Sequence, residues 1–120
     1  MTRNRASAKA AGSRFEREVA DYLAQAVDDR IDRRVTTGAK DKGDIGGVRI
    51  HGHRVVLECK NHARTDLAGW YAEAETQRDN DGAGIGLVVH KRRNIATPER
   101  QWVTMTLADL AWILRTAAGQ

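Results

Sequence analysis

Apolar residues recur at helical spacing in three stretches of the chain. In the first stretch, about 8–27, they cover one side of a helix. A second helix is expected over about 65–80, with Thr65 or Asp66 as its N-cap. The third follows Thr106, which with Asp109 resembles a capping box. The apolar stripes are Phe15, Val19, Tyr22, Leu23 and Ala26; Leu67, Trp70, Tyr71 and Ala74; and Leu107, Leu110, Ala111 and Leu114.

Between these helices, short apolar runs bounded by turn residues predict strands. The runs 44–51 and 54–60 flank the turn "HGH" and are expected to pair as an antiparallel hairpin. The run "IGLVVH" is typical of a central strand. Shorter strands are expected within "RIDRRVTT" and "WVTMT".

Length and composition favour one globular domain. The 120 residues are 41% hydrophobic and 30% charged, which is ordinary for a folded domain of this size. The expected order α-β-β-β-α-β-β-α predicts a single α/β domain over 1–120, in which helices flank a mixed sheet. Residues 1–8 are expected to form a basic, flexible N-terminus.

The charge of the chain changes this picture, because it is unevenly distributed. The net charge is +4, and Arg3, Arg5, Lys9 and Arg14 stand near the start without a neighbouring acid. A second basic cluster lies at 91–93. Such clusters favour phosphate-rich partners such as nucleic acid. The single cysteine and the lack of an apolar run near 20 residues lead us to expect a cytoplasmic protein with no membrane partner.

Two charged residues interrupt the apolar strand "RVVLECK". Strand alternation places Glu58 and Lys60 on one face and Cys59 on the other. Asp44 opens the preceding strand, so an antiparallel hairpin brings it to the same end of the pair as Glu58. Two adjacent carboxylates repel and need a cation between them. Oxygen ligands of this kind suit Mg²⁺, with Mn²⁺ as a substitute.

A third carboxylate is expected to reach this site from the first helix. Glu16 falls near 100° on the helix wheel, between Leu23 and Val27, and is therefore on the apolar side, unlike Glu18. Together with the hairpin residues it completes the set that metal-assisted phosphodiester hydrolysis needs, Glu16, Asp44, Glu58 and Lys60.

These residues and their order resemble a known nuclease signature. "GD" followed one hairpin later by "ECK" is similar to the PD-(D/E)XK nucleases. The segments "GSRFEREVADYL" and "TTGAKDKGDI" resemble those of the archaeal-type Holliday junction resolvases and their phage-encoded relatives. The resemblance covers about 10–91. Gly43 replaces the proline that gives the signature its name, and the basic loop 91–100 has no counterpart in the pattern.

The resemblance implies a restriction-endonuclease-like core and a homodimer that works on DNA four-way junctions in a bacterial or phage-infected host cell. It implies that Asp44, Glu58 and the backbone carbonyl of Cys59 bind Mg²⁺, with Glu16 binding directly or through water. Lys60 would position the attacking water, and the products would carry 5′-phosphate and 3′-hydroxyl ends.

Further residues are candidates for DNA contacts. In the family, basic and hydroxyl residues precede the aspartate, which indicates Arg34, Thr36 and Thr37. We also expect Gln77 to face the site. The three tryptophans, Trp70, Trp102 and Trp112, are expected in the core or at a dimer surface rather than as stacking platforms. The remaining candidates are the phosphate contacts Lys40 and Lys42 and the basic cluster Lys91, Arg92 and Arg93.

The residues alone leave three functions open. The first is a metal-dependent, structure-specific DNA endonuclease, and the second is a nuclease for ordinary duplex or damaged DNA. The third is a DNA-binding module without catalysis. The complete set of three carboxylates and a lysine argues against the third, because carboxylates repel DNA unless a metal screens them.

Overall fold

The helices and strands follow one another along the chain in the predicted order. The computed structural model describes residues 4–35 and 41–120. Its helices are α1 (Arg5–Ala26), α2 (Leu67–Asp81) and α3 (Leu107–Ala117), with a 3₁₀ turn, η1, at Pro98–Arg100. Its strands are β1 (Asp32–Arg33), β2 (Ile45–Gly46), β3 (Arg49–Ile50), β4 (His53–Lys60), β5 (Ile85–His90) and β6 (Trp102–Thr104). If β2 and β3 count as one interrupted strand, the order α-β-β-β-α-β-β-α is confirmed.

The helices begin and end at capped residues, with one difference from expectation. Asn4 caps α1 by accepting a hydrogen bond of 2.8 Å from the backbone N–H of Ser7, so α1 begins at Arg5. Residues 5–8 are therefore helical and do not belong to a flexible N-terminus. In α3 the predicted capping box of Thr106 and Asp109 is present. No helix among the described residues is long and apolar enough to cross a membrane.

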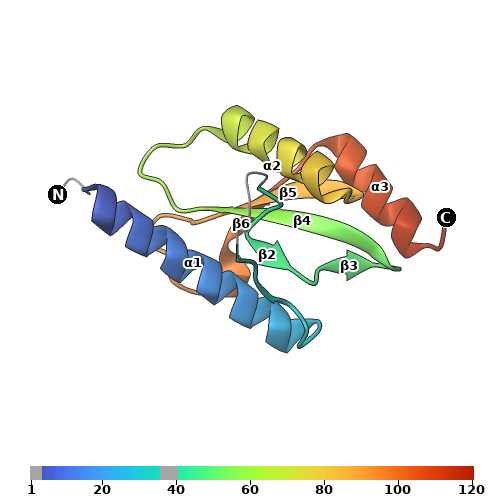
Figure 1. The fold of residues 1–120 in the computed structure, drawn as a ribbon, viewed down its shortest axis with the longest axis horizontal. Helices are drawn as coiled ribbons and strands as arrows, with labels where there is room; N and C mark the ends of the chain where they lie inside the picture. The colour runs from blue at the N-terminus through green and yellow to red at the C-terminus, as the bar shows by residue number, and fades with distance from the viewer. Residues whose placement is uncertain (1–3, 36–40) are drawn as a thin grey trace.

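The sheet is mixed and is covered by helices on both faces (Figure 1). Its strand order is β1-β2-β4-β5-β6, and β3 pairs with β4 beside this path. The central strands β4 and β5 run parallel, with α2 as the crossover between them, and the other pairs are antiparallel. Phe15 and Val19 of α1 pack on one face of the sheet, and Trp70 and Ala74 of α2 pack on the other.

A β-bulge at Gly47 separates β2 from β3. Ile45 pairs with Leu57, whereas Arg49 pairs with Arg54, so the strand with Gly47 contains one extra residue. Gly47 has φ +86, and a Cβ there would lie 2.7 Å from the carbonyl oxygen of Arg30. Because of the bulge, the apolar side chains before and after it, Ile45, Val48 and Ile50, all reach the core under α1.

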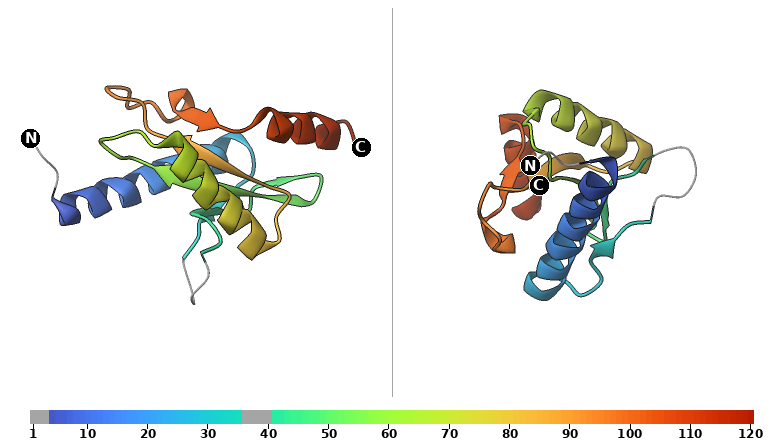
Figure 2. Two further views of the ribbon diagram at one scale, coloured as in Figure 1. Left: turned by 90° about the horizontal axis from the view of Figure 1, so that it is seen from above. Right: turned by 90° about the vertical axis from the view of Figure 1, so that its left-hand side faces the viewer.

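The apolar stripe predicted for α3 faces outward. Leu107 and Leu114 are 81% and 62% exposed, while Trp112 and Ile113 pack against the core. Asp109 is buried, and its carboxylate accepts a hydrogen bond from the hydroxyl of Tyr71 in α2, which offsets the cost of burying it. The helix lies beyond β6, at the opposite end of the molecule from the start of α1 (Figure 2).

We predict that Gly86→Ala lowers the free energy of unfolding by about 1–3 kcal/mol, as overpacking does elsewhere. Gly86 lies on β5 under α2, where a Cβ would collide with the carbonyl oxygen of Ala74. Urea unfolding of the two proteins measures the difference. Gly12→Ala in α1 is the matched control, because nothing lies within 4 Å of its Cβ position and alanine favours the helix by about 1 kcal/mol. Equal stability of Gly86→Ala and the wild type would contradict this account of the packing.

Candidate active site

Asp44 and the strand β4 are joined by two hydrogen bonds at the end of β2. The backbone N–H of Asp44 donates to the carbonyl of Leu57 at 2.9 Å, which extends the pairing by one residue. The Asp44 carboxylate then accepts a hydrogen bond of 2.7 Å from the backbone N–H of Cys59. These two bonds fix the carboxylate beside the charged end of β4, as the hairpin pattern predicted.

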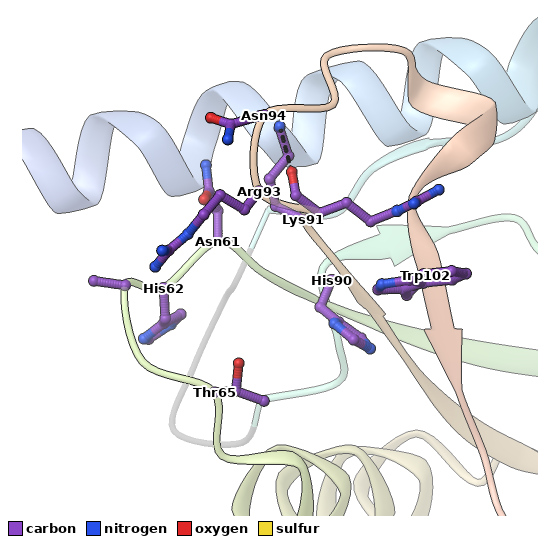
Figure 3. A pocket seen from close by; sticks show the side chains of 10 residues that line it. Asn61, His62, Thr65, His90, Lys91, Arg93, Asn94 and Trp102 are labelled. Carbon is purple, nitrogen blue, oxygen red and sulfur yellow. Dashed lines mark hydrogen bonds between the residues drawn. The ribbon is translucent and has the colours of Figure 1, made fainter.

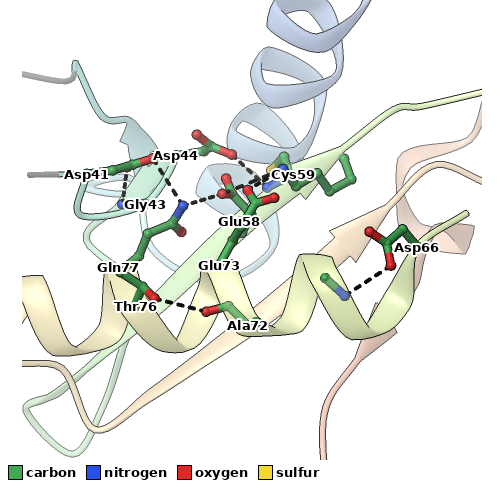
Figure 4. A network of polar contacts seen from close by, with 12 residues as sticks. Asp41, Gly43, Asp44, Glu58, Cys59, Asp66, Ala72, Glu73, Thr76 and Gln77 are labelled. Carbon is green, nitrogen blue, oxygen red and sulfur yellow. Dashed lines mark hydrogen bonds and ion pairs between the residues drawn. The ribbon is translucent and has the colours of Figure 1, made fainter.

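Glu58 is the most deeply buried acid on this face of the sheet. It is 4% exposed, lies under α2 and accepts a hydrogen bond from the side-chain amide of Gln77 (Figure 4). Burial and the neighbouring Asp44 raise the pKa of Glu58 to about 9. At neutral pH and without a cation, Glu58 is therefore protonated.

Lys60 stands next to Glu58 at the open end of β4. Its Nζ lies 3.9 Å from Oε2 of Glu58 and 2.7 Å from Oε2 of Glu73 on α2. Burial alone would lower the pKa of Lys60, but the hydrogen bond to Glu73 and the charge of Glu58 raise it overall. The ammonium therefore stays charged at neutral pH, between the side chains of Glu73 and Glu58.

Glu16 approaches the pair from α1, as its position on the helix wheel predicted. Its Oε1 accepts a hydrogen bond of 3.0 Å from the guanidinium of Arg33. Burial, followed by repulsion from Asp44, raises the pKa of Glu16. Glu16, Asp44, Glu58 and Lys60 thus line one cleft of about 540 Å³, bordered by the N-terminal part of α1, the end of β4 and α2.

Three more charged residues of this cleft were not singled out from the sequence. Arg33 bonds Glu16, Glu73 bonds Lys60, and Asp41 accepts a hydrogen bond of 3.1 Å from Gln77. Glu73 and Gln77 are four residues apart on α2, so the helical spacing from the expected Gln77 was a usable signal. Nothing in the sequence marks Asp41, which precedes the strand in an irregular segment.

Of the residues before Asp44 that were predicted to contact DNA, the structure describes some, and those do not line the cleft. Arg34 forms an ion pair of 2.7 Å with Asp81 at the end of α2 and does not line the cleft; Arg33 does. Lys42 is exposed outside the cleft lining. Thr37 and Lys40, with Thr36, lie outside the described residues.

The predicted contacts Lys91, Arg92 and Arg93 lie together in a second cleft of about 610 Å³ (Figure 3). This cleft adjoins the first, because Asn61 and His62 line both. The second cleft also contains Trp102, which is exposed and not in the core. The expectation of a core position holds for Trp70, which is buried, and Trp112 packs against the core.

The donor set of the first cleft fits a hard cation that keeps much of its water. Within 4–35 and 41–120, no three side chains of His, Cys, Asp or Glu group closely enough to hold a metal ion. Mg²⁺ needs fewer, since one or two carboxylates and several waters commonly hold it. The buried carbonyl oxygen of the Gln77 amide has no hydrogen-bond partner within the described part of the chain, so an acceptor there remains to be satisfied.

Cys59 contributes its backbone to this edge and its thiol to the core. The backbone N–H of Lys91 donates to the carbonyl of Lys60 at 3.0 Å, so the peptide groups of Lys60 face β5. Peptide directions alternate along a strand, and the carbonyl of Cys59 therefore faces the same edge as Asp44. The thiol packs under α1, where burial raises its pKa, which makes it unsuited to be a nucleophile.

Comparisons of the chain with protein-family models, with curated proteins and with solved structures found no match. The chemical case for the site therefore rests on the geometry described above.

We predict that, with EDTA present, Glu58→Gln raises the melting temperature at pH 8.5 by about 4 °C or more and leaves it nearly unchanged near pH 4.5. Since the pKa of Glu58 rises from 4.5 to about 9, the folded protein holds a proton that the unfolded chain releases between these values. Stability of the wild type should therefore fall as the pH rises through this window. Glutamine mimics the protonated acid and removes this dependence.

Thermal unfolding followed by circular dichroism at both pH values measures the effect. Glu18→Gln, on the exposed side of α1, is the control and should change neither melting temperature. A constant difference between Glu58→Gln and the wild type at both pH values would contradict the raised pKa.

Proposed function

We propose that this protein is a metal-dependent, structure-specific DNA endonuclease that cuts four-way junctions in the cytoplasm. The observation that carries the proposal is the buried Glu58 next to the half-buried Asp44, with Lys60 beside them and Glu16 across the cleft. Burying a carboxylate next to a second acid costs stability, so a function is the usual reason that a protein retains such an arrangement. The helix–hairpin–strand order around it supports a restriction-endonuclease-like core.

Asp44, Glu58 and the carbonyl of Cys59 would hold Mg²⁺ or Mn²⁺, with Glu16 binding directly or through water. When bound, the ion supplies positive charge that stabilises the phosphate in the transition state. Gln77 holds the Glu58 carboxylate in place by its hydrogen bond. Lys60, whose ammonium remains charged, would orient the attacking water and favour its hydroxide form, giving 5′-phosphate and 3′-hydroxyl ends.

Two alternatives remain distinct from this proposal. A nuclease for ordinary duplex DNA would use the same site but cut linear and branched DNA equally. A DNA-binding module would have no use for three acids gathered beside the phosphate path, because they weaken DNA binding without a cation. The raised pKa values of Glu16 and Glu58 support a site whose acids gain a positively charged partner, a metal ion, during catalysis.

We predict that the protein cuts a labelled four-way junction with Mg²⁺, leaves matched linear duplex largely uncut, and cuts nothing with EDTA. Asp44→Asn, Glu58→Gln and Glu16→Gln should each lower the cleavage rate by about 100-fold or more, the scale expected when one transition-state contact is lost. Glu18→Gln should cut at the wild-type rate. Gel-shift binding in Ca²⁺ or EDTA checks that each variant still binds the junction.

Each outcome of this assay separates the candidates. Equal rates on junction and linear duplex would favour the duplex nuclease. Binding without any cutting in Mg²⁺ or Mn²⁺ would favour the binding module. Wild-type cutting by Asp44→Asn or Glu58→Gln would place the active site elsewhere.

The proposed activity requires two cuts in one junction, which a homodimer with two active sites supplies. The outer side of α3 supports this partner, a second copy of the chain. Leu107, Leu110 and Leu114 repeat at helical spacing and are 81%, 40% and 62% exposed. A self-complementary apolar stripe of this kind is typical of two-fold symmetric dimers.

We predict that the wild type sediments as a dimer and that Leu107→Lys with Leu114→Lys yields a folded monomer, because four lysines would face one another across the interface. Analytical ultracentrifugation measures the mass, and circular dichroism checks the fold. Val27→Lys is the matched control, since Val27 is 69% exposed at the far end of α1. A monomeric wild type, or a double variant that still dimerises, would exclude this interface.

A further inference from the structure

The second cleft begins where the first ends. The segment after β4, including Asn61 and His62, borders both clefts, and His90 at the end of β5 continues the second one (Figure 3). A DNA strand whose phosphate lies at Lys60 would therefore pass directly into the second cleft. This cleft is as large as the first, at about 610 Å³.

The charge of the second cleft is opposite to that of the first. Its lining contains Lys91, Arg92 and Arg93 and no Asp or Glu. The ammonium of Lys91 is held by the carbonyl oxygens of Arg92 and Ile95, so Lys91 braces the loop. The guanidinium of Arg93 makes no hydrogen bond or ion pair with the part of the chain that the structure describes, and it is exposed. Arg93 is therefore free to contact a phosphate.

An aromatic platform stands in the same cleft. Trp102 is 53% exposed, and the guanidinium carbon of Arg92 lies 4.1 Å from its ring centroid. Gln101, just before Trp102 at the start of β6, holds the loop that carries Arg92, because its side chain accepts from the backbone N–H of Arg92 at 2.6 Å and donates to the carbonyls of Ile95 and Thr97. The stacked pair is thus held between the start of β6 and a braced loop before any ligand arrives.

We propose that this cleft binds an unpaired nucleotide of the DNA substrate beside the scissile phosphate. The base stacks on the Trp102–Arg92 pair, and Arg93 contacts the nucleotide's phosphate. Bases in an intact duplex already stack on their neighbours, so only an opened base can use such a platform. The inference rests on the proposed function and deepens it, since it gives a physical reason for preferring branched DNA, whose branch point contains bases that open easily.

The test measures binding with EDTA, so that it does not depend on cleavage. We expect a short oligothymidylate to quench the tryptophan fluorescence of the wild type and to bind Trp102→Ala about 5- to 150-fold more weakly, the range for loss of one stacked base. Trp102→Phe should recover most of the affinity, because its ring still stacks. A matched duplex should bind the wild type and Trp102→Ala equally.

Salt dependence tests the phosphate contact. Arg93→Ala should reduce the slope of log affinity against log salt by about 0.7, the value for one phosphate contact in single strands. Arg49→Ala is the matched control, because it removes an exposed cation of β3 that lies outside the cleft and should leave this slope unchanged.

The outcomes separate this inference from the proposed function. Unchanged oligothymidylate binding by Trp102→Ala, or an equal loss on duplex, would overturn the inference even if the wild type cuts junctions. Trp102-dependent binding of oligothymidylate by a wild type that cuts no DNA would support the cleft while rejecting the endonuclease.

Discussion

Burial of the Glu58 carboxylate beside Asp44 is the constraint on which the rest of the structure depends. Desolvation by burial, followed by the neighbouring Asp44, raises the pKa of Glu58, so Glu58 becomes charged only at a cost unless a cation is bound. The surrounding structure must therefore supply hydrogen bonds that hold the two groups in place. It does so with one donor from α2, the amide of Gln77, and one from the backbone, the N–H of Cys59.

The first of these donors depends on a glycine. Gln77 reaches Glu58 because α2 lies close to the sheet, and Gly86 on β5 permits that approach at the carbonyl of Ala74. Strand alternation places Asp44 on the face opposite Ile45, and the bulge at Gly47 lets Val48 and Ile50 reach the core on the same side as Ile45. The site is thus built from backbone geometry as much as from the acids themselves.

The sequence predicted the parts of the site that depend on local periodicity. Strand alternation placed Glu58 and Lys60 together, the hairpin placed Asp44 next to them, and the helix wheel placed Glu16 on the inner side of α1. The sequence named Arg34 and not Arg33, which lines the cleft, because β1 is only two residues long and its faces depend on partners far along the chain. Asp41 could not be found either, since its position is set by long-range bonds to α2.

Parallel pairing of the two central strands explains why the basic loop lies beside the acidic site. In the β4–β5 pair Lys60 is the partner of His90, so both strands end at the same edge of the sheet. The loop after β5 must therefore emerge next to the acids at the end of β4, as segments after parallel strands do in other α/β proteins. An acidic cleft suited to a cation and a basic cleft suited to phosphate then adjoin without a further domain. In the proposed nuclease, the loop at 91–100, which had no counterpart in the nuclease pattern, would be the segment that decides which DNA reaches the carboxylates.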